Sequence, residues 1–169
     1  IFRILLPAAM ERPTPEKRST AEPPRGSGHI LVMDDDAAIR SLAREMLQRI
    51  GYRVQVAADG DEAVVIYREE AAAGRRFDAV ILDLTVPGKP GGQQALAMLR
   101  QEDPQVLALV SSGYATDPVL AHPAEYGFAA VIPKPYDLRT LADTLLEALT
   151  QGHSPLASDL DQPSTNRLD

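Results

Sequence analysis

Short apolar runs alternate with stretches of helical periodicity between residues 29 and 150 of the chain. The apolar runs predict strands at about 29–33, 53–57, 78–82, 105–111 and 128–132. The stretches between and after them predict helices at about 37–50, 61–73, 92–102, 117–126 and 137–150. Strands that alternate with helices in this way are typical of βα units that build a parallel sheet. The pattern therefore predicts five such units.

Two of the predicted helices carry clear apolar stripes. From Ile39, apolar residues recur at i, i+3, i+4, i+7, i+8 and i+11, and the stripe ends at Gly51, where a glycine is a common helix stop. The last helix repeats this spacing after Asp137, which we expect to cap its first turn. The helix at 117–126 is less regular, because Pro123 lacks an N–H and should shorten or kink it.

Five βα units joined by right-handed crossovers favour an α/β fold. The expected architecture is a flavodoxin-like, doubly wound, five-stranded parallel sheet with strand order 2-1-3-4-5, formed as a single domain by residues 29–150. The chain has 169 residues, of which 44% are hydrophobic. This length suits one domain with an ordinary core and leaves little room for a second.

The two ends of the chain have a different composition. Residues 11–28 are rich in proline and charged side chains, which predicts a flexible linker. Residues 1–10 begin with an apolar run and without Met, and we interpret them as the remnant of a preceding domain. Residues 151–169 are polar and aperiodic, which predicts a disordered tail.

Composition excludes several kinds of partner. The net charge of −7 divides into +2 for residues 1–28 and −9 for residues 29–169, and such an acidic domain should repel nucleic acid. No apolar stretch approaches the roughly 18 residues that a membrane span needs, so we expect no membrane contact. The absence of cysteine rules out disulfides and thiolate metal sites and suits a cytoplasmic location.

Carboxylates follow two of the predicted strands. Asp34 and Asp35 come directly after the first strand, and Asp83 ends the third. These strands are neighbours in the expected order, about 4.8 Å apart, so the three side chains should share one crevice at the carboxyl edge of the sheet. Converging carboxylates repel one another unless a cation lies between them, and Mg²⁺ takes one or two carboxylates plus phosphate oxygens. We therefore expect a magnesium site in which Asp83 is the best-placed nucleophile.

Two further strand ends add polar groups to the same crevice. Ser111 and Ser112 follow the fourth strand, and Lys134 follows the fifth. A lysine and a hydroxyl that converge on an aspartate and a divalent cation can hold phosphoryl oxygens, as phosphoryl transfer requires. Asp36, by contrast, is expected only to favour the start of the next helix.

Four motifs, in this order and at these strand ends, resemble the receiver domain of response regulators over about residues 29–150. They are Leu31-Val32-Met33-Asp34-Asp35-Asp36, Ile81-Leu82-Asp83-Leu84-Thr85-Val86-Pro87-Gly88, Ser111-Ser112-Gly113-Tyr114 and Pro133-Lys134-Pro135-Tyr136.

The resemblance implies a role for each residue of the crevice. Asp83 is the implied phosphoacceptor, and Lys134 pairs with its phosphate. Asp35 is an implied direct ligand of Mg²⁺, Asp34 a ligand through water, and the backbone carbonyl of Thr85 a further ligand. The resemblance also implies that Ser112 is the switch hydroxyl and that the peptide bond between Lys134 and Pro135 is cis. A cis peptide bond has a low energetic cost only before proline.

The chain departs from the family pattern in two places. Three residues before Lys134, where the family often has an aromatic side chain that reports the switch, stands Val131. The loop at 87–92 counts one residue longer than usual, so the glycine that makes the family's turn remains open.

The amino-terminal residues suggest a context for the receiver. Residues 2–7 resemble the last strand of the ATP-binding domain of sensor histidine kinases. This favours the C-terminal receiver of a hybrid histidine kinase over a stand-alone regulator. The expected partner is a histidine kinase dimerisation and phosphodonor domain or a histidine phosphotransfer protein, with a monomer favoured. The chain itself is expected not to be an enzyme, apart from autodephosphorylation.

Two alternatives remain open. A Mg²⁺-dependent phosphatase with an aspartyl nucleophile normally needs a second acid two residues after that nucleophile, where this chain has Thr85. A docking module with an unused acidic pocket is the other alternative, although every group of the pocket is present. None of His29, His122 and His153 is followed by an acid, so none resembles a phosphodonor histidine.

Overall fold

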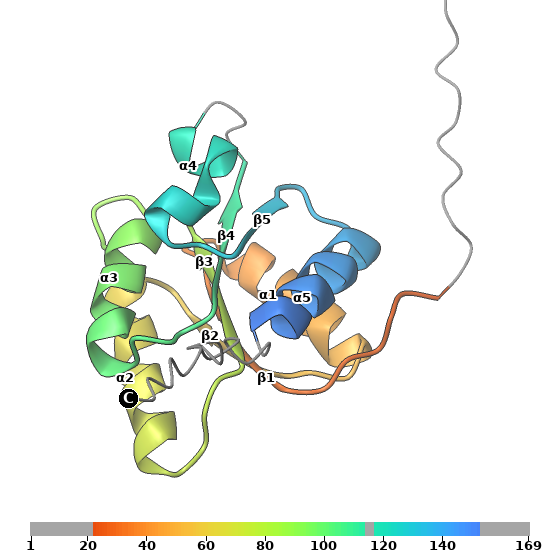
Figure 1. The fold of residues 1–169 in the computed structure, drawn as a ribbon, viewed down its shortest axis with the longest axis horizontal. Coiled ribbons are helices and arrows are strands. Elements are labelled where there is room, and N and C mark those ends of the chain that lie inside the picture. Colours follow the sequence, from red (N-terminus) through yellow and green to blue (C-terminus); the bar gives the residue numbers. More distant parts are fainter. Residues whose placement is uncertain (1–21, 114–116, 153–169) are drawn as a thin grey trace, which may run out of the picture.

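The computed structural model describes residues 22–113 and 117–152. Five parallel strands form one sheet in the order β2-β1-β3-β4-β5, which confirms the predicted fold (Figure 1). The strands are β1 His29–Met33, β2 Arg53–Ala57, β3 Ala79–Asp83, β4 Ala108–Ser112 and β5 Ala130–Pro133. The helices are α1 Ala37–Arg49, α2 Gly60–Ala72, α3 Gly92–Glu102, α4 Pro118–Ala121, the 3₁₀ helix η1 Pro123–Tyr126 and α5 Leu138–Gly152.

The sheet is covered on both faces. Helices α1 and α5 pack on one face, where Ile30 and Val32 of β1 point, and α2, α3 and α4 pack on the other, where Leu31 and Met33 point (Figure 1). Side chains alternate across a strand, so a strand buried on both faces must be apolar throughout. This explains why β1 and β3 appear in the sequence as unbroken apolar runs.

The fourth and fifth strands begin later than the sequence predicts. Residues 105–107 were expected in the fourth strand, but the amides of Gln105 and Val106 donate to Asp103, at 2.9 and 3.1 Å, in a turn after α3. β4 therefore starts at Ala108 and continues to Ser112, one residue past the expected end. β5 likewise starts two residues late and runs on to Pro133.

The irregular helix is divided as its proline predicts. α4 has four residues, and η1 follows after His122, whose backbone lies outside the helical region at φ −136° and ψ 58°. Proline disfavours the α conformation in the residue before it, which places this break. The chain then turns at Gly127, where φ is 85°.

Aspartates cap the helices beside the carboxyl edge. The Asp36 side chain accepts hydrogen bonds from the amides of Ala38 and Ile39 at the start of α1. Asp137 accepts hydrogen bonds from the amides of Arg139 and Thr140, both at 2.9 Å, at the start of α5. Each carboxylate satisfies donors that a helix leaves unpaired at its first turn.

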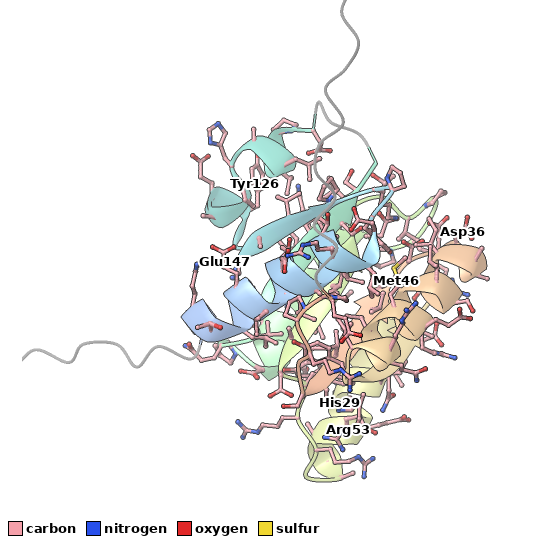
Figure 2. The ribbon with its side chains drawn as sticks, turned by 90° about the vertical axis from the view of Figure 1, so that its right-hand side faces the viewer. His29, Asp36, Met46, Arg53, Tyr126 and Glu147 are labelled. Atoms are coloured by element: carbon pink, nitrogen blue, oxygen red, sulfur yellow. The ribbon has the colours of Figure 1, made fainter. Side chains whose placement is uncertain are left out.

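The last residues of the predicted linker are attached to the domain. The amide of Gly26 donates to the carbonyl of Ile50, and the amide of Arg53 donates to the carbonyl of Gly28, both at 2.8 Å. A Cβ atom at position 26 would overlap the Tyr52 hydroxyl. This end of the domain carries His29 and Arg53, and Asp36 lies at the other end (Figure 2).

The other predictions for the ends of the chain fall largely outside the described residues. These are the remnant at 1–10, most of the linker and all of the predicted tail except Gln151 and Gly152, which belong to α5. Within the described part, every helix is too short or too polar to cross a bilayer.

Candidate functional site

The carboxylates predicted to converge do so at the carboxyl edge of the sheet. One oxygen from each of Asp34, Asp35 and Asp83 lies within 4.8 Å of the others. They line an open pocket of about 420 Å³. The other residues that line it are Asp36, Ile39, Thr85, Pro87, Ser112, Gly113 and Lys134. Asp34, Asp35, Asp83, Thr85, Ser112 and Lys134 therefore meet at one place, whereas Ser111 does not line the pocket.

Lys134 bridges two of the three carboxylates. Its Nζ atom lies 2.6 Å from Asp34 Oδ2 and 2.8 Å from Asp83 Oδ1. Burial acts to lower the pKa of Lys134, but the hydrogen bonds to both carboxylates outweigh it and raise this pKa overall. The side chain therefore remains a cation and provides part of the countercharge that the carboxylates require.

Asp83 is buried, with 7% of its surface exposed. Its pKa is raised, chiefly by burial, with the charges of Asp34 and Asp35 acting in the same direction and Lys134 opposing them. The charged form of Asp83 is thus less favourable than it would be in water. A cation or a phosphoryl group that takes up this charge would relieve the cost.

The two acids at the end of β1 differ in what they can still bind. Asp34 is 1% exposed, and its Oδ1 accepts a hydrogen bond from the amide of Asp36 at 3.0 Å while its Oδ2 accepts from Lys134. Asp35 is exposed and still reaches the cluster. This arrangement favours Asp35 for direct contact with a cation and Asp34 for contact through water.

Glycines bring the loop after β3 close to the strand end. Gly88 has a φ of 69°, which identifies it as the glycine that makes the turn. A Cβ atom at Gly92 would lie 2.9 Å from the carbonyl oxygen of Asp83, and one at Gly91 would overlap the carbonyl of Leu84. Side chains at these positions would push the loop, and with it Thr85, away from the pocket.

The ends of β4 and β5 supply the remaining groups. Ser111 is the partner of Asp83 in the register, but Ser112 is the serine that lines the pocket. The amide of Lys134 donates to the carbonyl of Ser112 at 2.9 Å. The peptide bond between Lys134 and Pro135 is cis, as the resemblance implied. Tyr114, the last residue of its motif, lies outside the described residues.

Sequence reasoning did not identify Arg40. Its Nη1 atom donates to the carbonyl oxygens of Asp34 and Asp35, at 2.7 and 2.9 Å. The available signal was its spacing, since a residue in the first turns of α1 can reach back over the loop that precedes the helix. This spacing alone does not indicate a functional contact, because Arg40 binds main-chain carbonyls and not a side chain.

An apolar groove of about 360 Å³ adjoins the acidic pocket. Residues from α1 and from the segment after β5 line it, namely Ile39, Leu42, Gly113, Lys134, Pro135 and Tyr136. Leu42 is 45% exposed although it is a large apolar side chain. Burial and, next, the charge of Asp34 raise the pKa of Tyr136 to about 12, so its hydroxyl stays neutral.

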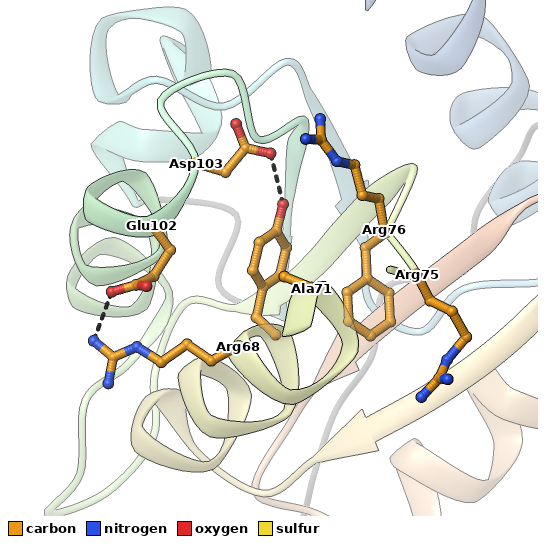
Figure 3. A pocket seen from close by; sticks show the side chains of 8 residues that line it. Arg68, Ala71, Arg75, Arg76, Glu102 and Asp103 are labelled. Atoms are coloured by element: carbon orange, nitrogen blue, oxygen red, sulfur yellow. Dashed lines mark hydrogen bonds and ion pairs between the residues drawn. The ribbon is translucent and has the colours of Figure 1, made fainter. Parts of the chain in front are cut away.

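A further pocket, of about 380 Å³, lies at the opposite end of the sheet, between α2, the end of α3 and the start of β3 (Figure 3). Its two acids already have partners. Glu102 accepts from Arg68 at 2.6 Å, and Asp103 accepts from the Tyr67 hydroxyl at 2.9 Å (Figure 3). In the acidic pocket, by contrast, three carboxylates converge within 4.8 Å of one another and a single lysine contacts two of them, so we take that pocket as the functional site.

One family model and several curated proteins are similar to this chain. The family model described as the response regulator receiver domain matches residues 30–146. The chain is 34% identical over 160 residues to the sensor kinase CckA of Brucella abortus, covering 88% of the chain and 16% of that protein. It is 31% identical over 124 residues to the transcriptional regulatory protein CpxR of Escherichia coli, covering 73% of the chain and 50% of that protein. The chain thus spans half or less of these relatives.

Solved structures agree with this result. A two-component response regulator of the LuxR family from Aurantimonas superposes with a TM-score of 0.65 at 30% identity, covering 75% of the chain and 87% of the other. The chemotaxis protein CheY4 of Vibrio cholerae superposes with a TM-score of 0.63 at 26% identity, covering 73% and 99%.

Proposed function

The chain belongs to the family of response regulator receiver domains of two-component systems, and we propose that Asp83 is the residue that accepts its phosphoryl group. One observation carries the assignment. Asp83 ends the central strand, within 4.8 Å of the carboxylates of Asp34 and Asp35 and 2.8 Å from the ammonium of Lys134. A nucleophile, acids for a cation and a fixed positive charge are thus present together.

The proposed reaction transfers a phosphoryl group from a phosphohistidine. Asp83 Oδ2 attacks the phosphorus atom, because Lys134 already engages Oδ1. The new O–P bond forms while the P–N bond breaks, and the electron pair of that bond returns to the imidazole nitrogen. Lys134 pairs with the transferred phosphoryl oxygens, and the Ser112 hydroxyl acts as the switch that turns toward them.

The donor set fits Mg²⁺. Carboxylates and a backbone carbonyl are the hard oxygen ligands that this ion prefers. Asp35 and Asp83 would hold it directly, Asp34 through water, and the carbonyl of Thr85 would complete the protein ligands. When bound, the ion supplies positive charge to the phosphoryl oxygens during transfer.

We assign partner docking to the apolar groove beside the pocket. A helix that carries a phosphohistidine could bury apolar residues against Ile39, Leu42 and Pro135 and present its imidazole to Asp83. The likeness to the sensor kinase CckA supports a hybrid kinase as the parent protein. On this proposal the receiver is a monomeric cytoplasmic module that lacks turnover of its own except autodephosphorylation, with a kinase domain or a phosphotransfer protein as partner.

The two alternatives have less support. Thr85 stands where an aspartyl phosphatase would need its acid, and it is exposed at the rim of the pocket. A docking module without phosphorylation has no use for Lys134 beside two buried acids and one exposed acid at one point. Turnover of a phosphomonoester would favour the first alternative, whereas Mg²⁺ affinity unchanged by beryllofluoride would favour the second.

The experiment uses acetyl phosphate as donor. With Mg²⁺, the wild-type chain should gain the mass of one phosphoryl group, and Asp83→Asn should gain none, because an amide oxygen is a poor nucleophile. Asp61→Asn, an exposed acid on α2, is the matched control and should label as wild type does. Labelling of Asp83→Asn at the wild-type rate would overturn the assignment.

A further inference from the structure

The loop that carries the acids is held from three directions. On the inner side, the Asp34 carboxylate binds the amide of Asp36 and the ammonium of Lys134. At its end, Asp36 caps α1. On the outer side, the guanidinium of Arg40 donates to the carbonyl oxygens of both Asp34 and Asp35. The first two sets of contacts fix Asp34 and Asp36, whereas the hydrogen bond from Arg40 acts on the main chain of Asp35.

Two consecutive carbonyls can share one donor group only if the peptide planes at 34 and 35 are both turned toward it. Nη1 carries two hydrogens, so it can donate to both oxygens without weakening either bond. Turning these carbonyls toward Arg40 restricts the backbone torsions of Asp35, whose side chain is exposed. The torsions of Asp35 determine whether its carboxylate faces the pocket.

From these contacts we infer that Arg40 is a positioning residue for the cation site, which holds the main chain so that the Asp35 carboxylate is directed at Asp34 and Asp83. The inference rests on the proposed function, since it assumes that the acidic pocket binds Mg²⁺. Groups that hold metal ligands in place typically account for a 10-fold to 100-fold change in affinity, which sets the expected size of the effect.

A purely electrostatic role for Arg40 makes the opposite prediction. A guanidinium beside three carboxylates reduces the negative potential that attracts a cation. If charge alone mattered, replacing Arg40 by a neutral side chain would tighten Mg²⁺ binding. If positioning matters more, the same replacement weakens it, because the Asp35 carboxylate is released. The sign of the change in affinity therefore separates the two roles.

The test compares Mg²⁺ dissociation constants, measured by titration calorimetry and by NMR of the Asp35 amide, in the full chain. Arg40→Met removes the charge and both hydrogen bonds and should raise the dissociation constant about 10-fold or more. Arg40→Lys keeps the charge without the planar fork and should show an intermediate loss. Arg44→Met, an exposed arginine one turn along α1, is the matched control and should bind Mg²⁺ as wild type does.

A second readout does not depend on the metal. In the absence of Mg²⁺, the amides of Asp35 and Asp36 should exchange with deuterium faster in Arg40→Met than in wild type, while amides of β3 stay protected. Should Arg40→Met fail to fold, Arg40→Lys carries the test through its Mg²⁺ affinity.

Wild-type affinity or tighter binding in both Arg40 variants would overturn the inference. That result is distinct from a failure of the proposed function, in which the wild-type chain itself would bind no Mg²⁺ or would label at a residue other than Asp83.

Discussion

Lys134 occupies a position that a divalent cation would otherwise share. Its ammonium contacts Asp34 and Asp83 in a pocket where burial makes the charge of Asp83 unfavourable. Without a cation, this lysine is what makes two adjacent buried carboxylates tolerable. It therefore stabilises the fold and also competes for the oxygens of the cation site.

This dual role predicts the behaviour of Lys134→Met. In EDTA its free energy of unfolding should fall by about 3 kcal/mol, because two carboxylates lose their buried partner. Mg²⁺ should bind it more tightly than wild type and restore part of the lost stability, since a ligand of the native state stabilises that state. Phosphorylation by acetyl phosphate should nevertheless slow, because the phosphoryl oxygens lose their fixed cation.

Urea unfolding with and without Mg²⁺ measures both effects. Lys89→Met is the control, because Lys89 forms a more exposed ion pair with Asp59 at 3.3 Å and its loss should cost less than about 1 kcal/mol. Equal stability of Lys134→Met and wild type in EDTA would contradict the role given to Lys134.

Single residues differ in how far the sequence predicts them. Asp34, Asp35, Asp83 and Lys134 were predicted because each follows an apolar run, and parallel strands bring such ends together. The pattern alone did not distinguish Ser112 from Ser111, and the resemblance made that choice. Arg40 was missed because it acts on main-chain carbonyls, and no side-chain motif indicates such a contact.

At the scale of elements, the start of β1 is tied to α2 and to the segment before β3. His29 stacks on Phe77 with ring centroids 4.1 Å apart, and its Nδ1 lies 3.9 Å from Glu70 Oε2. Two hydrogen bonds from Arg75 hold Glu70 in place. This pairing is the main reason why the pKa of Glu70 is lowered to about 2. Glu70 therefore carries its negative charge beside His29 at neutral pH.

The burial of His29 makes the stability of the fold depend on pH. Burial lowers the pKa of His29, and the charge of Glu70 only partly opposes this effect. Below about pH 6.5 the unfolded chain takes up a proton that the native His29 resists, so acidification favours unfolding. The free energy of unfolding should fall as the pH drops from 7 to 5, with a contribution of at most about 1.4 kcal/mol per pH unit from this residue.

Denaturant unfolding across this pH range tests the expectation. His29→Phe should flatten the slope, because a phenyl ring cannot titrate, whereas His122→Gln, at an exposed position, should leave it unchanged. An equally steep slope in His29→Phe would assign the pH dependence to other groups.

Element boundaries show where sequence patterns lose their power. Pro123 predicted the break in the fourth helix because a missing N–H is a local property. The 3₁₀ turn that follows depends on a bond from the Glu125 amide to His122, which no residue pattern indicates. Apolar residues before β4 suggested strand, but hydrogen bonds to Asp103 hold that segment in a turn. Local hydrogen bonds between residues two or three positions apart decided both cases.

At the scale of the whole molecule, the preceding chain and the acidic pocket lie at opposite ends of the sheet. The chain enters at Gly28 and reaches the acids only after the five residues of β1, a path of about 17 Å. In Figure 1 this segment runs beside the end of the domain away from α4. Residues 22–28 therefore lie away from the pocket and the adjoining groove.

The sequence could not predict this attachment. Glycine is typical of flexible linkers, but it is also the residue that lets two backbone segments approach closely. Gly26 and Gly28 lie in a segment whose composition predicts the first behaviour, and their contacts with Ile50 and Arg53 show the second. A flexible linker and a bound segment can have the same composition. Only the surface against which the segment packs decides which of the two forms.

Replacing Gly26 tests whether this contact holds the entering chain in solution. In Gly26→Ala the new methyl group would overlap Tyr52, so the segment should detach from the turn between α1 and β2. Trypsin should then cleave after Arg25 several-fold faster, and the Arg53 amide should lose protection from exchange, because its bond to Gly28 is broken.

Ser27→Ala, at an exposed neighbouring position, should change neither the rate of cleavage nor the protection of the Arg53 amide. Labelling of Asp83 should stay at the wild-type rate, since the pocket lies at the far end of β1. A Gly26→Ala chain as resistant to trypsin as wild type would mean that the segment is not held against the turn between α1 and β2.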